Sequence, residues 1–443
     1  MGEFFCEYYT KTQMKVTILI IAITVLVMLF SIITDKRIRI GKKSFGLYCI
    51  LPPIGAVALI IAGKLPIDTL ISYFVSDTSV NPIKILLLFL SMTVFSLVLD
   101  EAGFFTYVAS KAVKRTGTNQ RTLFFALFIT VAFLTVFTSN DVVILTVTPF
   151  VIAFCKKANC NPMPHLLLEF VTANTWSMLL VIGNPTNIYV ASAYGITFVD
   201  YFLIMALPTV VSGIVSVSVV FLIFNKSLRQ PMQPCFEETT LKDKPLTIIA
   251  GIHLSVCIIL LAISNIIDIE MWLVSTVTAC LLLVCVLVYL LVRSKPLKTL
   301  SNSLKRLPYE IIPFVVGMFA IVLCLSIEGI AEKINTLLKP LDSIFSYGIG
   351  TTLTANLINN IPATVLFAEI LKTSKDIGAI YATVIGSNIG AYVTPVGALA
   401  GIMWHNILSH NGVKLSFGRF CTYGIFVAVP TLLSALVVLK III

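Results

Sequence analysis

The chain has 443 residues, of which 58% are hydrophobic and only 12% are charged. Soluble domains carry roughly 25% charged residues, so this composition excludes a sizeable soluble domain and indicates a polytopic membrane protein. The net charge of +10 would suit a nucleic-acid partner if it covered one surface. The basic residues instead lie mostly in loops between apolar segments, which is typical of membrane orientation, and no nucleic-acid partner is expected.

Ten apolar segments are long enough, as continuous or broken helices, to cross a bilayer. They cover residues 16–33, 45–62, 83–103, 164–195, 201–224, 246–266, 271–292, 311–328, 377–408 and 417–439. No small-residue cleavage site follows the first segment, so it is expected to remain a span and not a removable signal. The longest polar stretch, 225–244, is expected to be a cytoplasmic linker between a first half, 1–224, and a second half, 245–443.

Two further apolar regions, 121–155 and 344–372, are interrupted by polar residues, "TSND" at 138–141 and "NLINN" at 356–360. The arms that follow the interruptions are short, because 13 residues (142–154) rise about 20 Å and ten residues (362–371) about 15 Å in a helix. Neither arm crosses a hydrocarbon core of about 30 Å. We therefore expect two re-entrant helical hairpins whose tips lie inside the membrane.

The basic residues predict the orientation of the chain. If the ten segments cross and both hairpins return to their own side, most of the 31 Lys and Arg residues lie on one side of the membrane, which is expected to be the cytoplasm. They occur at 36–43, 111–121, 156–157, 226–244, 293–306 and 414–419. Both termini are therefore expected outside, in an inner or plasma membrane.

The two halves resemble each other in sequence. "LVLDEAG" (97–103) aligns with "LCLSIEG" (323–329), a hairpin follows each, and then come "VIGNPTN" (181–187) and "VIGSNIG" (384–390). Five crossings precede the midpoint, and an odd number inverts the second half. The fold class predicted is all-α and polytopic, with about ten transmembrane helices, two hairpins and two inverted-topology repeats. The broken helices, 164–195 and 377–408, are expected to break at the membrane midplane, as in secondary transporters.

Glycine, proline and asparagine in these segments free backbone groups that lipid cannot satisfy, so such breaks survive only where they line a cavity. Freed carbonyls suit a cation, and half-helix N-termini favour anions. Interhelical hydrogen bonding is the alternative explanation, but four clusters at repeated positions favour a binding site. The predicted substrate or ion site contains Thr138, Ser139, Asn140, Asp141, Asn174, Thr175, Asn184, Thr186, Asn187, Asn359, Asn360, Thr364, Ser387, Asn388 and Thr394. A sodium ion is placed at Ser139, Asn140, Gly183, Asn360 and Gly386.

Carboxylates inside apolar segments are costly and usually functional. Asp141 follows a hairpin tip and is the expected coupling residue. Glu169 and Glu369 fit either a functional position or an interface. The acidic residues that close spans are expected to be interfacial; these are Asp100, Glu101 and Glu328.

At these motifs the sequence resembles the arsenite-permease family of the ion transporter superfamily over nearly the whole chain. The resemblance is carried by "LVLDEAGFF" (97–105), "SNDVVILTVTPFVIA" (139–153), "NNIPATVL" (359–366) and "YATVIGSNIGAYVTPVGALAGIMWHNIL" (381–408). It implies export of arsenite or antimonite hydroxides driven by protons. The sequence departs from that family at Asn388, where an Asp is usual, and in "TANTWSM" (172–178), which lacks an acidic residue. "GNPTN" (183–187) is more similar to the break of the superfamily's sodium-coupled anion transporters.

The predicted function is secondary transport of a small oxyacid or anion, most like proton-driven arsenite efflux. Sodium-coupled uptake of a di- or tricarboxylate or other anion, and sodium–proton antiport, remain alternatives; a channel is disfavoured by the opposed hairpins. No nucleophile–base pair, HExxH or phosphate loop indicates an enzyme. ATP hydrolysis would therefore need a separate subunit, which is not expected to be required, and no cofactor beyond a coupling ion, sodium or a proton, is expected. A homodimer remains open. The ten cysteines show no metal-ligand spacing and are expected to be reduced hydrophobic residues.

Overall fold

The computed structural model describes residues 2–34, 36–40, 43–78, 81–114, 116–233, 240–338, 341–372, 374 and 376–443, with the backbone alone at 2–13 and in the described part of 39–44. The basic residues Lys42 and Arg115 and the linker residues 234–239 lie outside the described residues. The described chain is almost entirely helical, which confirms the predicted fold class. One short antiparallel hairpin, β1 (Arg37–Ile40) and β2 (Lys43–Gly46), was not predicted.

Within the described residues, twenty α-helices form two sets of ten. The first set is α1 (Gly2–Ile33), α2 (Leu51–Ile61), α3 (Ile67–Val75), α4 (Pro82–Glu101), α5 (Phe104–Lys114), α6 (Gln120–Phe137), α7 (Asn140–Lys157), α8 (Met163–Trp176), α9 (Pro185–Ala193) and α10 (Phe198–Phe224). The second is α11 (Lys244–Ala262), α12 (Met271–Val292), α13 (Lys298–Lys305), α14 (Ile311–Ile327), α15 (Ile330–Leu338), α16 (Ser343–Ile358), α17 (Asn360–Ile370), α18 (Ile377–Gly390), α19 (Leu399–His410) and α20 (Phe417–Ile442). Short 3-10 turns lie at η1 (Leu47–Cys49), η2 (Val181–Gly183) and η3 (Ser227–Arg229).

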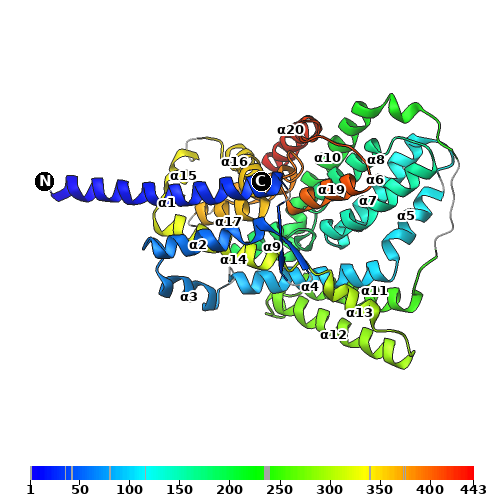
Figure 1. Cartoon of the computed structure of the whole chain (residues 1–443), viewed down its shortest axis with the longest axis horizontal. Coiled ribbons are helices and arrows are strands. Elements are labelled where there is room, and N and C mark those ends of the chain that lie inside the picture. Colours follow the sequence, from blue (N-terminus) through cyan, green and yellow to red (C-terminus); the bar gives the residue numbers. More distant parts are fainter. Residues whose placement is uncertain are drawn as a thin grey trace.

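Each helix of the first set has a counterpart ten helices later. Helix α8 packs on α6, α7 and α10, and α18 packs on α16, α17 and α20. Helix α9 crosses to the second hairpin and contacts α17, while α19 crosses to the first and contacts α7. The two hairpins lie on opposite sides of the molecule, and α10 packs against α20 between them (Figure 1). The packing is therefore that of a two-fold repeat, with exchanged half-helices at its centre.

Seven helices within the described residues are single spans by length and composition, namely α1, α4, α6, α10, α11, α12 and α20. Their outer faces are apolar, with Leu203 and Leu222 of α10 and Leu281 and Val284 of α12 exposed. An apolar surface of this extent suits lipid and not water. The remaining predicted crossings use α2, α14 and the broken pairs α8–α9 and α18–α19. Helix α6 is long enough to span but is the first arm of a hairpin that returns, so it is not counted as a crossing. Each set then crosses five times, which inverts the second relative to the first.

The first hairpin differs in length from the prediction. Its return arm α7 has 18 residues, as has α6, so each arm rises about 27 Å and not the shorter distance expected from 142–154. Helix α17 has 11 residues and rises about 17 Å, close to the expected length. The tips of both hairpins nevertheless end against the breaks in the broken helices, as described below, and not at the far surface.

Four short helices between the spans, α3, α5, α13 and α15, were not predicted. Helices α5 and α15 occupy equivalent positions, because each begins just after a glycine in the left-handed region, Gly103 (φ 84°) and Gly329 (φ 67°). The second of these turns bends the chain by 76° between α14 and α15. A side chain at such a φ is strained, so glycine lets each span turn abruptly into its following helix.

The polar linker ends in an ion-pair network at the start of α11. Asp243 caps the helix by accepting from the Leu246 amide at 3.2 Å, and it also accepts from Lys295 Nζ at 2.6 Å and Tyr289 Oη at 2.8 Å. Partial burial alone would raise the pKa of Asp243, but the bonds from Lys295 and Tyr289 outweigh burial and hold that pKa below its ordinary value.

Candidate functional site

The first broken helix stops at Trp176 and restarts at Pro185. Proline at the first helical position lacks the N–H that would be unpaired there, and the Asn184 side chain caps the new helix by accepting from the Thr186 amide at 3.2 Å. A Cβ on Gly183 would collide with the Ser177 carbonyl oxygen. Glycine is therefore required where the chain folds back against the end of α8.

The second break lies later than "VIGSNIG" predicts. Residues 384–390 are inside α18, and the chain leaves the helix only after Gly390 and restarts at Leu399. A Cβ on Gly397 would lie 2.5 Å from the Gly390 carbonyl oxygen, so Gly397, and not Gly386, is the counterpart of Gly183. The prediction of a break at 384–390 was wrong because similar letters fall at different positions of the two repeats.

The helix ends set the correct alignment of the repeats, in which Asn174 corresponds to Asn388. Both side chains donate through Nδ2 to the carbonyl one turn earlier, Asn174 to Phe170 at 2.8 Å and Asn388 to Val384 at 2.9 Å. Each asparagine thus sits near the end of the first half-helix, facing the break. The two amides therefore occupy equivalent positions, one in each repeat.

Asn388 joins the two repeats. Its Nδ2 donates to Asn187 Oδ1 at 2.7 Å, while its Oδ1 accepts from Ser177 Oγ at 2.9 Å and from Asn184 Nδ2 at 3.0 Å. With the bond to Val384, both donors and both acceptor positions of the amide are used. A buried amide from the second repeat thus stabilises the break of the first.

The tip of the first hairpin lies against the same region. The Ser139 amide donates to Ser96 Oγ at 3.2 Å, and Asn140 Nδ2 donates to Asn174 Oδ1 at 3.3 Å. Asn140 Oδ1 is buried and has no hydrogen-bond partner among the described residues. An unpaired buried carbonyl is costly, so this oxygen is a candidate ligand atom.

The tip of the second hairpin is fixed to the second break. Asn359 adopts a φ of 79° and donates to the Val396 carbonyl at 3.2 Å, and the Asn360 amide donates to the Gly397 carbonyl at 2.9 Å. Thr394 donates to Asn356 Oδ1 at 2.8 Å. Each hairpin tip therefore meets the break of its own repeat.

The predicted residues divide into two groups. The amides and Ser139 meet at the tips and breaks, and Thr175 links the repeats through Tyr392 Oη at 3.3 Å. In contrast, three predicted hydroxyls donate to carbonyls of their own helix or its end, which is a local structural role; these are Thr138 to Leu134, Thr364 to Asn360 and Ser387 to Val384. Thr186 is buried beside Asn187. The sodium site predicted at Gly386 depended on a helix break at that residue. Gly386 lies inside α18 instead, and its carbonyl accepts from Thr352 at 3.0 Å.

A cavity of about 390 Å³ leads to the first hairpin tip. Ser139 and Asp141 line it, and so do Lys305, Arg306 and Glu310. Asp141 is half-buried and makes no hydrogen bond or ion pair with any described residue. It is therefore a carboxylate that a substrate or proton entering the cavity could reach.

The two other acidic residues within apolar segments, Glu169 and Glu369, differ in burial. Glu169 is fully buried on α8 and accepts from Thr148 Oγ1 at 2.8 Å. Glu369 accepts from Ser326 at 2.7 Å and pairs with the exposed Lys372 at 3.0 Å, which is an interfacial arrangement.

The carboxylates that close spans have basic partners. Arg306 pairs with Asp100 at 2.7 Å and with Glu101 at 3.0 Å, and Glu328 lies 3.9 Å from Lys64. Their position at the membrane interface stays a prediction.

Sequence reasoning missed several residues of the site, namely Ser96, Ser177, Asn356, Tyr392 and Gly397. Two signals were present in the chain: Asn356 lies one turn before the second tip, and the spacing from Asn174 to Gly183 recurs from Asn388 to Gly397. Ser96 comes from α4 and Tyr392 from the break between α18 and α19, and only the tertiary structure brings these side chains to Ser139 and Thr175.

Two hairpins and two broken helices, arranged as inverted repeats around a polar centre, define a membrane transporter. The chain belongs to the citrate transporter family (CitMHS), which matches residues 15–383. The arsenical pump membrane protein of Escherichia coli K12 is 26% identical over 369 residues, covering 79% of this chain and 84% of that protein. This similarity confirms the resemblance to arsenite permeases.

Two further similarities extend over almost the whole chain. An uncharacterized transporter of Mycobacterium tuberculosis is 25% identical over 438 residues, covering 94% of this chain and 97% of that protein. The crystal structure of the Alcanivorax borkumensis YdaH transporter, described as having an unusual topology, matches with a TM-score of 0.54 at 13% identity, covering 97% and 98% of the two chains. The latter similarity supports the fold alone.

Proposed function

We propose that this transporter exports a small oxyacid of the arsenite or antimonite type by alternating access, coupled to protons. The observation that carries the proposal is the uncharged centre joined by Asn388, next to a cavity that contains one unpaired carboxylate. Relatives named arsenical pump membrane proteins support this substrate class. In this proposal the chain works without a separate ATPase subunit.

The chemistry of the centre suits a small hydroxylated ligand. Four half-helices, α7, α9, α17 and α19, begin at the tips and breaks, and their N-termini carry partial positive charge. The polar side chains that meet there are amides and hydroxyls, which both donate and accept. A neutral or singly charged oxyacid would be bound by these groups without a fixed cation.

Asp141 is the proton carrier in this scheme. It lies one residue after the tip residue Asn140 and on the cavity wall. A carboxylate next to the substrate position can exchange one proton per cycle as the cavity changes sides. The basic residues Lys305 and Arg306 also line the cavity, so the positive-inside rule favours an opening to the cytoplasm.

The direct test is flux in proteoliposomes. Arsenite or antimonite should move against its gradient when a proton gradient is imposed, and collapse of that gradient by an uncoupler should stop it. Protein-free liposomes and Asn140→Ala vesicles serve as controls. Failure of both metalloids to move under either orientation of the gradient would contradict the proposal.

Sodium-coupled uptake of a carboxylate is the second candidate. The unpaired Asn140 Oδ1 next to Ser139 favours it, since oxygen ligands suit a hard cation, and the family is described as citrate transporters. Ser139 and Asn140 are the residues that would hold sodium, which would supply charge to balance a carboxylate. Sodium should then raise the melting temperature of the purified protein while potassium at equal ionic strength does not; identical curves in both salts would eliminate this candidate.

A further inference from the structure

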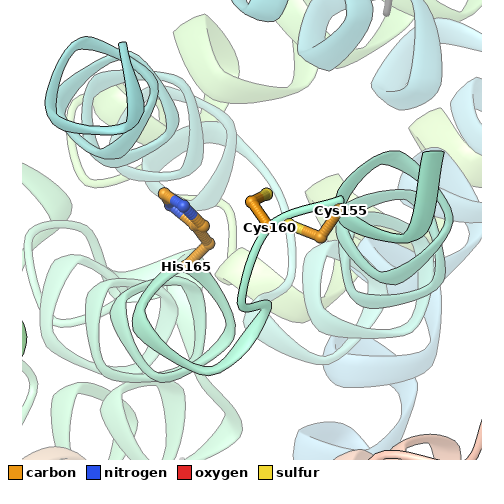
Figure 2. A group of neighbouring side chains, drawn as sticks. All are labelled: Cys155, Cys160 and His165. Atoms are coloured by element: carbon orange, nitrogen blue, oxygen red, sulfur yellow. The ribbon is translucent and has the colours of Figure 1, made fainter. Parts of the chain in front are cut away.

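Cys155, Cys160 and His165 form a group at the connection between α7 and α8. Their ligand atoms all lie within 4.8 Å of one another. Cys155 is in the last turn of α7, Cys160 in the connection and His165 in the first turn of α8, and Cys160 lies between the other two (Figure 2). The group is outside the transport centre, at the base of the first hairpin.

The environment of His165 indicates that something is bound there. The side chain is completely buried, yet neither ring nitrogen hydrogen-bonds to any residue that the structure describes. Its ring packs at 6.3 Å from the ring of Phe124. Buried polar groups are nearly always paired, and leaving one unpaired costs about 1–3 kcal/mol. A metal–nitrogen bond would satisfy one of the two ring nitrogens.

Both cysteines are reduced, and Cys155 is buried while Cys160 is half-buried. Two thiolates and one imidazole are ligands that zinc prefers, and three protein ligands leave a fourth position for water or another donor. Two thiolates also balance the charge of a divalent ion. Four residues separate Cys155 from Cys160, and four separate Cys160 from His165. The first spacing is within the range of zinc motifs, but a single His follows in place of the usual second ligand pair, so the sequence did not indicate a site.

We propose that Cys155, Cys160 and His165 bind one zinc ion. With zinc–sulfur bonds of about 2.3 Å and zinc–nitrogen bonds of about 2.0 Å, two sulfur ligands of a tetrahedral ion lie about 3.8 Å apart and a sulfur and a nitrogen about 3.5 Å apart. The group therefore needs to contract by about 1.3 Å at most. Cys160 can supply this movement, because it lies in the connection and not in a helix. The ion would hold the base of the hairpin to the first half of the broken helix.

Cobalt is the probe for the test, because tetrahedral cobalt with thiolate ligands gives visible and charge-transfer absorption. The full-length protein in detergent should bind one equivalent, and zinc should displace it. Cys160→Ser and His165→Ala should each lower cobalt affinity at least tenfold. Cys280→Ser and Cys285→Ser, which change exposed cysteines on α12, are the matched controls and should bind as the wild type does.

Cys160→Ser keeps the test decisive even if the buried positions do not tolerate change, because its side chain is half-exposed and its loss leaves no cavity in the core. Its metal-free melting temperature should equal that of the wild type, and zinc should stabilise the wild type alone. Absence of a cobalt spectrum in the wild type, or an unchanged spectrum in Cys160→Ser, would overturn the proposal. Neither result depends on transport activity.

Discussion

Asn388→Asp is the substitution that most directly tests the centre described here, because it changes one nitrogen to oxygen and leaves the shape of the side chain. The two bonds that Asn388 accepts, from Ser177 and Asn184, can remain. The two bonds that it donates, to Asn187 Oδ1 and the Val384 carbonyl, are lost. Two buried acceptors then face a carboxylate. At about 1–3 kcal/mol for each unpaired buried group, the free energy of unfolding should fall by about 2–6 kcal/mol.

Thermal unfolding of the purified protein in detergent measures this loss. An unfolding entropy of about 2.1 cal/mol/K per residue over 443 residues converts each kcal/mol into about 1 °C, so the melting temperature should fall by about 2–6 °C. Asn174→Asp removes a single donated bond and should cost about half as much, while the exposed Asn265→Asp should cost nothing. A melting temperature for Asn388→Asp that equals the wild-type value would refute the hydrogen-bond assignment at the centre.

Asn140→Ala should abolish transport while leaving the melting temperature nearly unchanged, since the side chain makes one long hydrogen bond. If the variant transported as the wild type does, Asn140 would have a structural role only. Asp141→Asn should flatten the pH dependence of transport, and an unaltered pH profile would remove Asp141 from coupling. Gly397→Ala should destabilise the fold by about 1–3 kcal/mol through overpacking, whereas Gly251→Ala, which meets open space, should not. Asp243 has a lowered pKa, so its ion pair stabilises the fold above the unfolded-state pKa of about 3.9, and this stabilisation is lost as pH falls through the folded-state pKa. The melting temperatures of Asp243→Asn and the wild type should therefore converge in acid. A constant difference between them at all pH values would contradict this.

The exchange of half-helices explains how the two repeats depend on each other. Helix α9 contacts the second hairpin and α19 contacts the first, so movement of either hairpin is transmitted to the broken helix of the opposite repeat. Asn388 adds a direct bond across the same interface. In the alternating-access cycle proposed above, these contacts would let a change on one side of the centre alter the packing on the other.

The sequence predicted the positions of the hairpins and broken helices because their signals are local. Polar residues inside apolar runs, such as those at 138–141 and 356–360, are costly in lipid, so they mark breaks wherever the chain places them. The position of the second break, in contrast, could not be predicted from such a local signal. "VIGSNIG" is similar to "VIGNPTN" in letters, but its backbone is satisfied inside α18, and only the contact between Gly397 and the helix end shows where the chain turns.

By itself the sequence determined the membrane class, the two-fold organisation and the residues from which a site could be built, because hydrophobic length and polar interruption act within single segments. The tertiary structure decided which of those residues meet. Asn388 bonds to Ser177, Asn184 and Asn187 since the second repeat packs its helix end against the break of the first. Cys155, Cys160 and His165 come together because a short connection joins α7 to α8. Such contacts depend on packing between helices, and no pattern along one segment contains them.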